Sequence, residues 1–124
     1  MCKKSFMAFL FVALLGVCSV EAAVSKNKLM SIAKKQEILS AKLIHAYKTQ
    51  SLTDTIGTIE KGHAVLQKNT KDPKIKNLIQ YLNTCIMDLK KLSTKPYSKE
   101  NALLVSEISL LLGEGSHYVQ NRLK

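Results

Sequence analysis

Apolar residues recur every three or four positions from residue 75 to residue 92, and this spacing limits the fold more than any other feature of the sequence. Such spacing places side chains on one face of an α-helix. Asp72 and Pro73 precede the stripe as a helix N-cap and a first-turn proline. We therefore predict a long amphipathic helix that begins at Pro73 and ends before a turn at residues 93–96. The stripe comprises Ile75, Leu78, Ile79, Leu82, Cys85, Ile86, Leu89 and Leu92.

The same spacing predicts three more helices, joined by short loops. The first runs from Ser25 to about Gln50, the second follows Ser51, and the last follows Ser98. Apolar residues cover more than one face of the last helix, which indicates burial on two sides. No segment alternates between apolar and polar residues as strands do. The expected fold is all-α, an antiparallel up-and-down four-helix bundle.

The second predicted helix has a thin apolar face and two glycines, Gly57 and Gly62. Each glycine lowers helix propensity by about 1 kcal/mol relative to alanine. We therefore expect this helix to be the least stable of the four.

The first 22 residues have the pattern of a secretory signal peptide. Lys3 and Lys4 form a positive segment, and an apolar run of 12 residues follows at positions 6–17. A bilayer span needs about 20 apolar residues, so this run is too short to cross a membrane. Val20 and Ala22 complete an A-x-A-like cleavage site. We predict a cut after Ala22 and a periplasmic or secreted mature chain.

A lipoprotein acylated at Cys18 and an uncleaved membrane anchor are the alternatives to this prediction. Val17 argues against the lipoprotein, because the position before a lipidated cysteine requires a small residue. Removing 22 of the 124 residues leaves 102, enough for one hydrophobic core, so we expect a single domain over residues 23–124. That domain would keep Cys85 as its only cysteine, which we interpret as a core thiol, with intermolecular pairing as the alternative.

Lysine dominates the charge of the predicted mature chain, which holds 17 basic and 8 acidic residues for a formal charge of about +9. Arg122 is the only arginine, whereas proteins that read nucleic acid use arginine for bidentate contacts and aromatic residues for stacking. We therefore expect no nucleic-acid partner. The lysines are interpreted as a solvated face, with weak attraction to anionic ligands or membrane surfaces as the alternative.

The sequence carries no catalytic or metal-binding pattern. His45, His63 and His117 fall on three different predicted helices, without the i, i+4 pair or the cysteine-rich spacing of a metal site. No nucleophile elbow, phosphate loop or Cys–His pair occurs. We predict no enzymatic activity, no metal and no cofactor, and we expect His63 to be a core histidine because it continues an apolar stripe.

Two polar residues interrupt the apolar stripe of the first predicted helix. Gln36 and Ser40 are one turn apart, so their side chains can converge on one ligand or on a partner helix. Lys35 and Lys42 flank them with positive charge. The sequence leaves three interpretations open: a polar layer inside the bundle, a small-ligand site that includes both lysines, and a dimer contact.

Residues 33–47 resemble the helix 1 motif of the N-terminal sensor domain of type IV pilus methyl-accepting chemotaxis transducers (the PilJ type). That motif is close to A-G-R-Q-R-M-L-S-Q-R-M-A-x-x-Y. Lys35, Ile38 and Lys42 match it in kind. The identical positions are Ala33, Gln36, Leu39, Ser40 and Tyr47.

Three positions depart from the motif. Lys34 replaces its glycine, Ala41 replaces its second glutamine, and Glu37 replaces its central arginine. In the related nitrate and nitrite sensor kinases an arginine of this segment holds the anion. The negative charge of Glu37 at that position therefore disfavours nitrate as the ligand.

The resemblance implies a sensor-type domain that binds a small ligand, with anions among the candidates, or acts as an adaptor to a membrane receptor, through the Gln36 and Ser40 face. Family members pass a signal through a transmembrane helix, and we expect no stable span in the mature chain, so a second protein would carry the signal. The alternative is a structural or interaction protein that binds no ligand. Its last helix would pack in a homodimer or against an envelope partner, with Leu112 and Val119 as the predicted interface residues.

Overall fold

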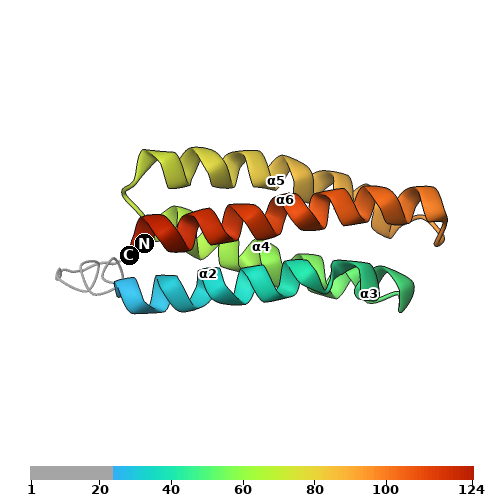
Figure 1. The fold of residues 1–124 in the computed structure, drawn as a ribbon, viewed down its shortest axis with the longest axis horizontal. Coiled ribbons are helices and arrows are strands. Elements are labelled where there is room, and N and C mark those ends of the chain that lie inside the picture. Colours follow the sequence, from blue (N-terminus) through green and yellow to red (C-terminus); the bar gives the residue numbers. More distant parts are fainter. Residues whose placement is uncertain (1–23) are drawn as a thin grey trace, which may run out of the picture.

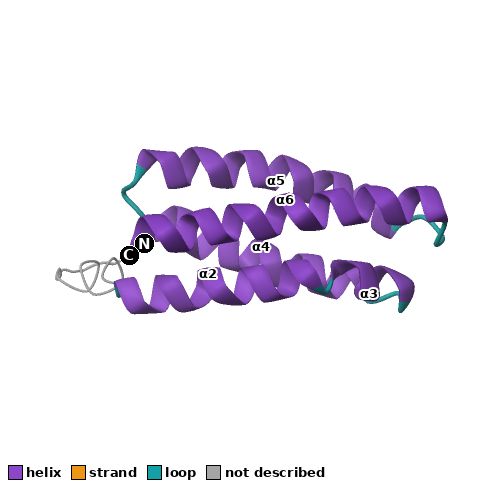
Figure 2. Ribbon diagram, in the orientation of Figure 1, coloured by secondary structure: helices purple, strands orange, loops and turns teal. Residues whose placement is uncertain are grey.

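The computed structural model describes residues 24–124, so the predicted signal peptide and the alternative lipidation site at Cys18 lie outside the described residues. All secondary structure within residues 24–124 is helical, as the sequence predicts (Figures 1 and 2). The described part of the chain forms five helices where four were expected. They are α2 (Lys26–Ala41), α3 (Leu43–Lys48), α4 (Leu52–Asn69), α5 (Pro73–Ser93) and α6 (Lys99–Leu123).

The extra helix arises because the first expected helix is divided at Lys42. Lys42 has φ −95° and ψ 0°, and its N–H bonds to the carbonyl of Leu39, one residue closer than a regular α-helix requires. The hydroxyl of Ser109 on α6 donates to the carbonyl of Ser40. This bond from a neighbouring helix occupies a carbonyl that an unbroken helix would use internally.

Helices α5 and α6 begin where the sequence supplies a capping side chain. The side chain of Asp72 accepts from the N–H of Lys74 at the start of α5, and Pro73 occupies the first turn. The hydroxyl of Ser98 accepts from the N–H of Asn101 at 3.1 Å at the start of α6. These side chains satisfy N–H groups that have no partner inside the helix.

The helices lie side by side, with the beginning of α2 and the end of α6 at the same end of the molecule (Figure 1). Helices α2 and α5 each pack against both α4 and α6, and α3 extends the contacts of α2 with the same two neighbours. Arg122 near the end of α6 donates to the carboxylate of Asp72 at 2.6 Å. This bond joins the last helix to the N-cap of α5, and it lowers the pKa of Asp72.

The core consists of two apolar clusters separated by buried polar residues. The larger cluster includes Leu43, Ile59 and Leu112, and the smaller one includes Ala33, Leu66 and Val119. On α2, α4 and α6, buried polar residues fall between the residues of the two clusters. We call this set the polar layer: Gln36, Ser40, His63 and Ser116.

Helix α5 adds no polar side chain to this layer. Its buried face is apolar along its whole length and includes the free thiol of Cys85, which is 7% exposed. The position of Cys85 agrees with the expected core thiol.

Candidate functional site

The four residues of the predicted ligand site do not share one surface. Gln36 and Ser40 are buried at 2% and 1% exposure, whereas Lys35 and Lys42 are exposed to solvent. The lysines therefore lie on the outside of the helix whose inner face carries the two polar residues. A ligand that touched the exposed lysines would not reach the Gln36 amide without a rearrangement of the helices.

The Gln36 amide lies between α2 and α4. Its Nε2 donates to the carbonyl of Ile59 at 3.1 Å, and it fills the space above Gly62. An ideal Cβ built on Gly62 would lie only 1.3 Å from Gln36 Nε2, so the close approach requires glycine at this position. The Oε1 atom of Gln36 is buried without a hydrogen-bond partner among the described residues.

Ser40 takes part in two hydrogen bonds, one through its hydroxyl and one through its backbone carbonyl. Its hydroxyl donates to the carbonyl of Gln36 at 2.7 Å, and its own carbonyl accepts from the Ser109 hydroxyl. These contacts join α2 to itself and to α6, which is the arrangement expected of a polar layer. They leave the Ser40 side chain directed at protein backbone.

His63 is the ionisable residue of the polar layer. It is 2% exposed, as expected for a core histidine, and its Nδ1 has no hydrogen-bond partner among the described residues. Burial lowers the pKa of His63 below 6.5, against the opposing effects of a side-chain hydrogen bond with Asn83 and the charge of Glu60. The imidazole is therefore held in its neutral form near neutral pH.

The predicted interface residues Leu112 and Val119 lie in the core of the described residues. Leu112 and Val119 are 0% and 1% exposed, one in each apolar cluster, so neither can contact a second molecule. The expected burial of α6 on two sides is not found: its buried residues lie on one face, and the leucines of the opposite side are exposed. The sequence pattern did not distinguish the residues of α6 that face the core from those that face solvent, because leucines occupy both sides.

The outward side of α6 carries exposed leucines and glutamates. Leu103 and Leu110 are 67% and 63% exposed, and Leu104 and Leu111 are also exposed. Glu107 and Glu114 are exposed on the same side of the helix. We call this surface the outer face of α6, and it comprises Leu103, Leu104, Glu107, Leu110, Leu111 and Glu114.

Two grooves flank the outer face of α6. The groove on the α2 side has a volume of about 540 Å³, and Ala41, Gly113 and Leu110 contribute to its lining together with Glu37 and Glu114. The groove on the α5 side has a volume of about 350 Å³, and its lining includes Leu104, Glu107 and Leu111 together with Lys91 and Lys95. The leucine side chains therefore stand beside hollows into which partner side chains could pack.

Glu37, at the position of the motif arginine, faces α6 across the first groove. Its Oε1 accepts from Gln120 Nε2 at 2.7 Å, and its Oε2 lies 3.8 Å from His117 Nδ1. The carboxylate thus stabilises the contact between α2 and α6. It also makes the edge of this groove acidic.

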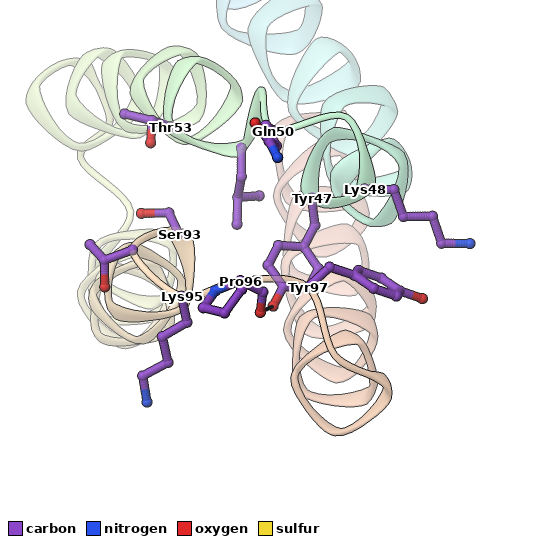
Figure 3. Close-up of a pocket in the computed structure, with 10 residues that line it drawn as sticks. Tyr47, Lys48, Gln50, Thr53, Ser93, Lys95, Pro96 and Tyr97 are labelled. Carbon is purple, nitrogen blue, oxygen red and sulfur yellow. Dashed lines mark hydrogen bonds between the residues drawn. The ribbon is translucent and has the colours of Figure 1, made fainter.

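A further cavity, of about 280 Å³, opens where α3 approaches the loop between α5 and α6 (Figure 3). Tyr47 donates to the carbonyl of Pro96 at 2.9 Å, and its ring lies 5.5 Å from that of Tyr97. The side chains of Lys48 and Lys95 point outward in different directions (Figure 3). The cavity therefore lacks a cation aimed into it that would hold an anionic ligand.

A metal-binding cluster and a membrane-spanning helix are both absent from residues 24–124. Within residues 24–124, no group of three or more His, Cys, Asp or Glu side chains is placed to hold a metal ion. None of the helices α2 to α6 is both long enough and apolar enough to cross a membrane.

Comparison with known proteins gives no relative for this chain: no family model, no curated protein and no solved structure matches it. The candidate site therefore depends on the geometry alone. The outer face of α6 was missed by the reasoning from sequence, although a signal for it exists. Leu103 and Leu110, Leu104 and Leu111, and Glu107 and Glu114 are each seven residues apart, which repeats a side-chain position on a helix.

Proposed function

We propose that this chain is a non-enzymatic helical binding domain that contacts a partner protein through the outer face of α6. The observation that carries the proposal is the exposure of Leu103, Leu104, Leu110 and Leu111 on one side of one helix. Single exposed leucines are common on protein surfaces, but several gathered on one side of one helix are typical of an interaction site. The proposal favours the interaction-protein alternative and also fits an adaptor to a membrane receptor.

In the proposed architecture the domain is an antiparallel up-and-down four-helix bundle in which α2 and α3 together take the place of one helix. Short connections support this arrangement, since α4 and α5 are separated only by residues 70–72 and α5 and α6 by residues 94–98. The packing of α2 and α5 against both α4 and α6 supports it as well. Such bundles commonly present one helix surface to a partner.

We place the domain outside the cytoplasm. The support is the sequence pattern of residues 1–22, with its positive start, short apolar run and small residues at the predicted cleavage site. A receptor or envelope protein would then be the partner reached by the outer face of α6.

The decisive experiment places a photo-crosslinking amino acid at position 110 and expresses the protein in its native cells. A matched control carries the same residue at Thr84, which is exposed on α5. We expect a discrete crosslinked adduct, identified by mass spectrometry, from position 110 and none of that mass from position 84. Equal adducts from both positions, or none from position 110, would contradict the proposal.

A small-ligand site at Gln36 is the second candidate function, and the unpartnered Oε1 of Gln36 is the observation in its favour. A thermal-shift screen with anions, amino acids and amines tests it, because saturation at about 100 times the dissociation constant stabilises a protein by about 2.7 kcal/mol. A shift that disappears in Gln36→Ala/Ser40→Ala would establish this site. No shift with any compound would leave partner binding as the function.

A further inference from the structure

We infer that the partner presents a basic amphipathic helix to the outer face of α6. This inference rests on the proposed function and adds the chemistry of the partner. The structure gives the face three properties that together favour such a helix: glutamates that no ion pair within residues 24–124 engages, apolar rows at helical spacing, and grooves along both sides.

The charge of α6 is opposite to that of the chain. The protein carries a formal charge of +10, yet residues 100–121 contain three glutamates and no lysine or arginine. The ion pairs within residues 24–124 join Lys90 to Glu60, His117 to Glu37 and Arg122 to Asp72. Glu100, Glu107 and Glu114 take part in none of them. Lys91 and Lys95 share the α5-side groove with Glu107, so the negative charge open to a cationic partner is concentrated on the α2 side, where Glu114 and Glu37 line the groove.

The apolar rows match the geometry of a helix partner. Leu103 and Leu110 form one row and Leu104, Leu111 and Tyr118 form another, each with seven-residue spacing. On a helical projection of 100° per residue, the glutamates fall between the two rows. From residue 103 to residue 118 the face is about 22 Å long, enough for four turns of a second helix.

A partner helix with leucines at positions a and d could pack along these rows, with lysine or arginine beside them. The grooves lined by Leu110 and by Leu104 would receive its apolar side chains. Oppositely charged side chains beside an apolar seam determine which helices pair. Glu37 extends the acidic edge on the α2 side.

A second copy of this chain fits the face less well. In a symmetric contact of α6 with α6, the glutamate rows of both copies would lie together, and like charges across an interface oppose pairing. A contact between this face and the lysines of another copy would be asymmetric and would continue from copy to copy. Such a contact would produce particles whose mass grows with concentration.

A lipid surface fits less well for the same electrostatic reason. Helices that lie on membranes carry lysine and arginine beside their apolar face, because many lipid headgroups are anionic. The leucines of α6 are interleaved with glutamates instead. A cationic protein segment complements this face, and an anionic membrane does not.

The test measures binding of two labelled helical peptides to the purified protein by fluorescence anisotropy. Both peptides carry the same leucines at positions a and d, and they differ only in lysines or glutamates at the flanking positions. We expect the basic peptide to bind about tenfold more tightly at low salt. The difference should shrink as salt shortens the screening length from about 10 Å at 0.1 M to about 3 Å at 1 M.

Variants assign the binding to the outer face of α6. Glu107→Gln/Glu114→Gln should weaken binding of the basic peptide about tenfold, and Leu103→Ser/Leu110→Ser should abolish binding of both peptides. The matched control, Asp54→Asn/Glu60→Gln on α4, removes the same charge elsewhere and should leave the affinity unchanged. Circular dichroism and light scattering confirm that each variant is folded and monomeric.

The outcomes separate this inference from the proposed function. Equal or tighter binding of the acidic peptide, lost in Leu103→Ser/Leu110→Ser, would overturn the basic partner and keep the interaction face. Failure of both peptides to bind would overturn the helical partner, while crosslinking at position 110 decides the function independently. Binding of anionic vesicles that needs Leu103 and Leu110, or mass that grows with concentration, would replace the partner helix with a membrane or a second copy.

Discussion

The amide of Gln36 occupies the space that any side chain at position 62 would need. Its bond to the Ile59 carbonyl holds α2 close to α4, and a buried amide of this kind is costly to leave unpaired. From the sequence, Gly62 is seen only as a residue that lowers the helix propensity of its segment. In the folded protein the same glycine admits the polar side chain that joins two helices.

Gly62→Ala should therefore lower the free energy of unfolding by up to about 2 kcal/mol. Displacing Gln36 from its buried bond costs about 1–3 kcal/mol, and alanine returns about 1 kcal/mol of helix propensity. Denaturant unfolding measures the change. In a Gln36→Ala background the clash is removed, so the same substitution should become neutral or stabilising.

Gly57→Ala is the matched control on the same helix. Nothing lies within 4 Å of a Cβ at this position. We expect Gly57→Ala to raise the free energy of unfolding by up to about 1 kcal/mol through helix propensity alone. Equal effects at Gly57 and Gly62 in denaturant unfolding would contradict the role assigned to Gln36.

The buried His63 should make stability depend on pH below 6.5. Because burial lowers the pKa of His63 in the folded state, the unfolded chain takes up a proton first as pH falls. Stability should therefore decrease from pH 6.5 downward until the folded-state pKa is reached. His63→Gln should show a shallower decrease in thermal unfolding over this range.

His45→Gln is the control for that measurement, since His45 is exposed on α3. Its unfolding profile should follow that of the unmodified protein. A His63→Gln variant with the same pH slope as the unmodified protein would show that other groups are responsible.

Among the helices, the division of α2 from α3 shows a neighbouring side chain overriding local propensity. Residues 25–50 have the spacing of one continuous helix, and Lys42 is a good helix former. The bond from Ser109 to the Ser40 carbonyl comes from a residue 69 positions away. Local sequence therefore predicts the helical faces correctly but not the break between them.

Helix α6 should depend on its N-cap. Ser98 satisfies the N–H of Asn101, so Ser98→Ala should lower the free energy of unfolding by about 1 kcal/mol. Ser98→Asp should retain the stability, because a carboxylate also accepts from the N-terminal N–H groups and favours the positive end of the helix. Denaturant unfolding of the two variants tests this; equal losses would rule out a capping role.

At the scale of the whole molecule, the buried side of α6 contributes to stability, and its exposed side is the proposed binding surface. Leu112→Ala removes a fully buried side chain from the larger cluster and should cost about 2–5 kcal/mol in denaturant unfolding. Leu110→Ala, two residues earlier and 63% exposed, should change stability by less than about 0.5 kcal/mol. A large loss of stability in Leu110→Ala would mean that the outer face of α6 is part of the core.

The sequence by itself determined the helical class, the caps at Asp72 and Ser98, and the buried stripe from Ile75 to Leu92. These features depend on periodicity and on groups within a few residues of each other, which are local properties of the chain. It also identified Gln36 and Ser40 as unusual.

Only the tertiary structure decided what those residues do. Gln36 and Ser40 meet partners 23 and 69 residues away, so their roles follow from the packing of helices and not from spacing along one helix. The same holds for α6, where leucines occupy both the inward and the outward side. Which leucines became core and which remained exposed depended on where α2 and α5 packed against the helix, because burial is a property of neighbours in space.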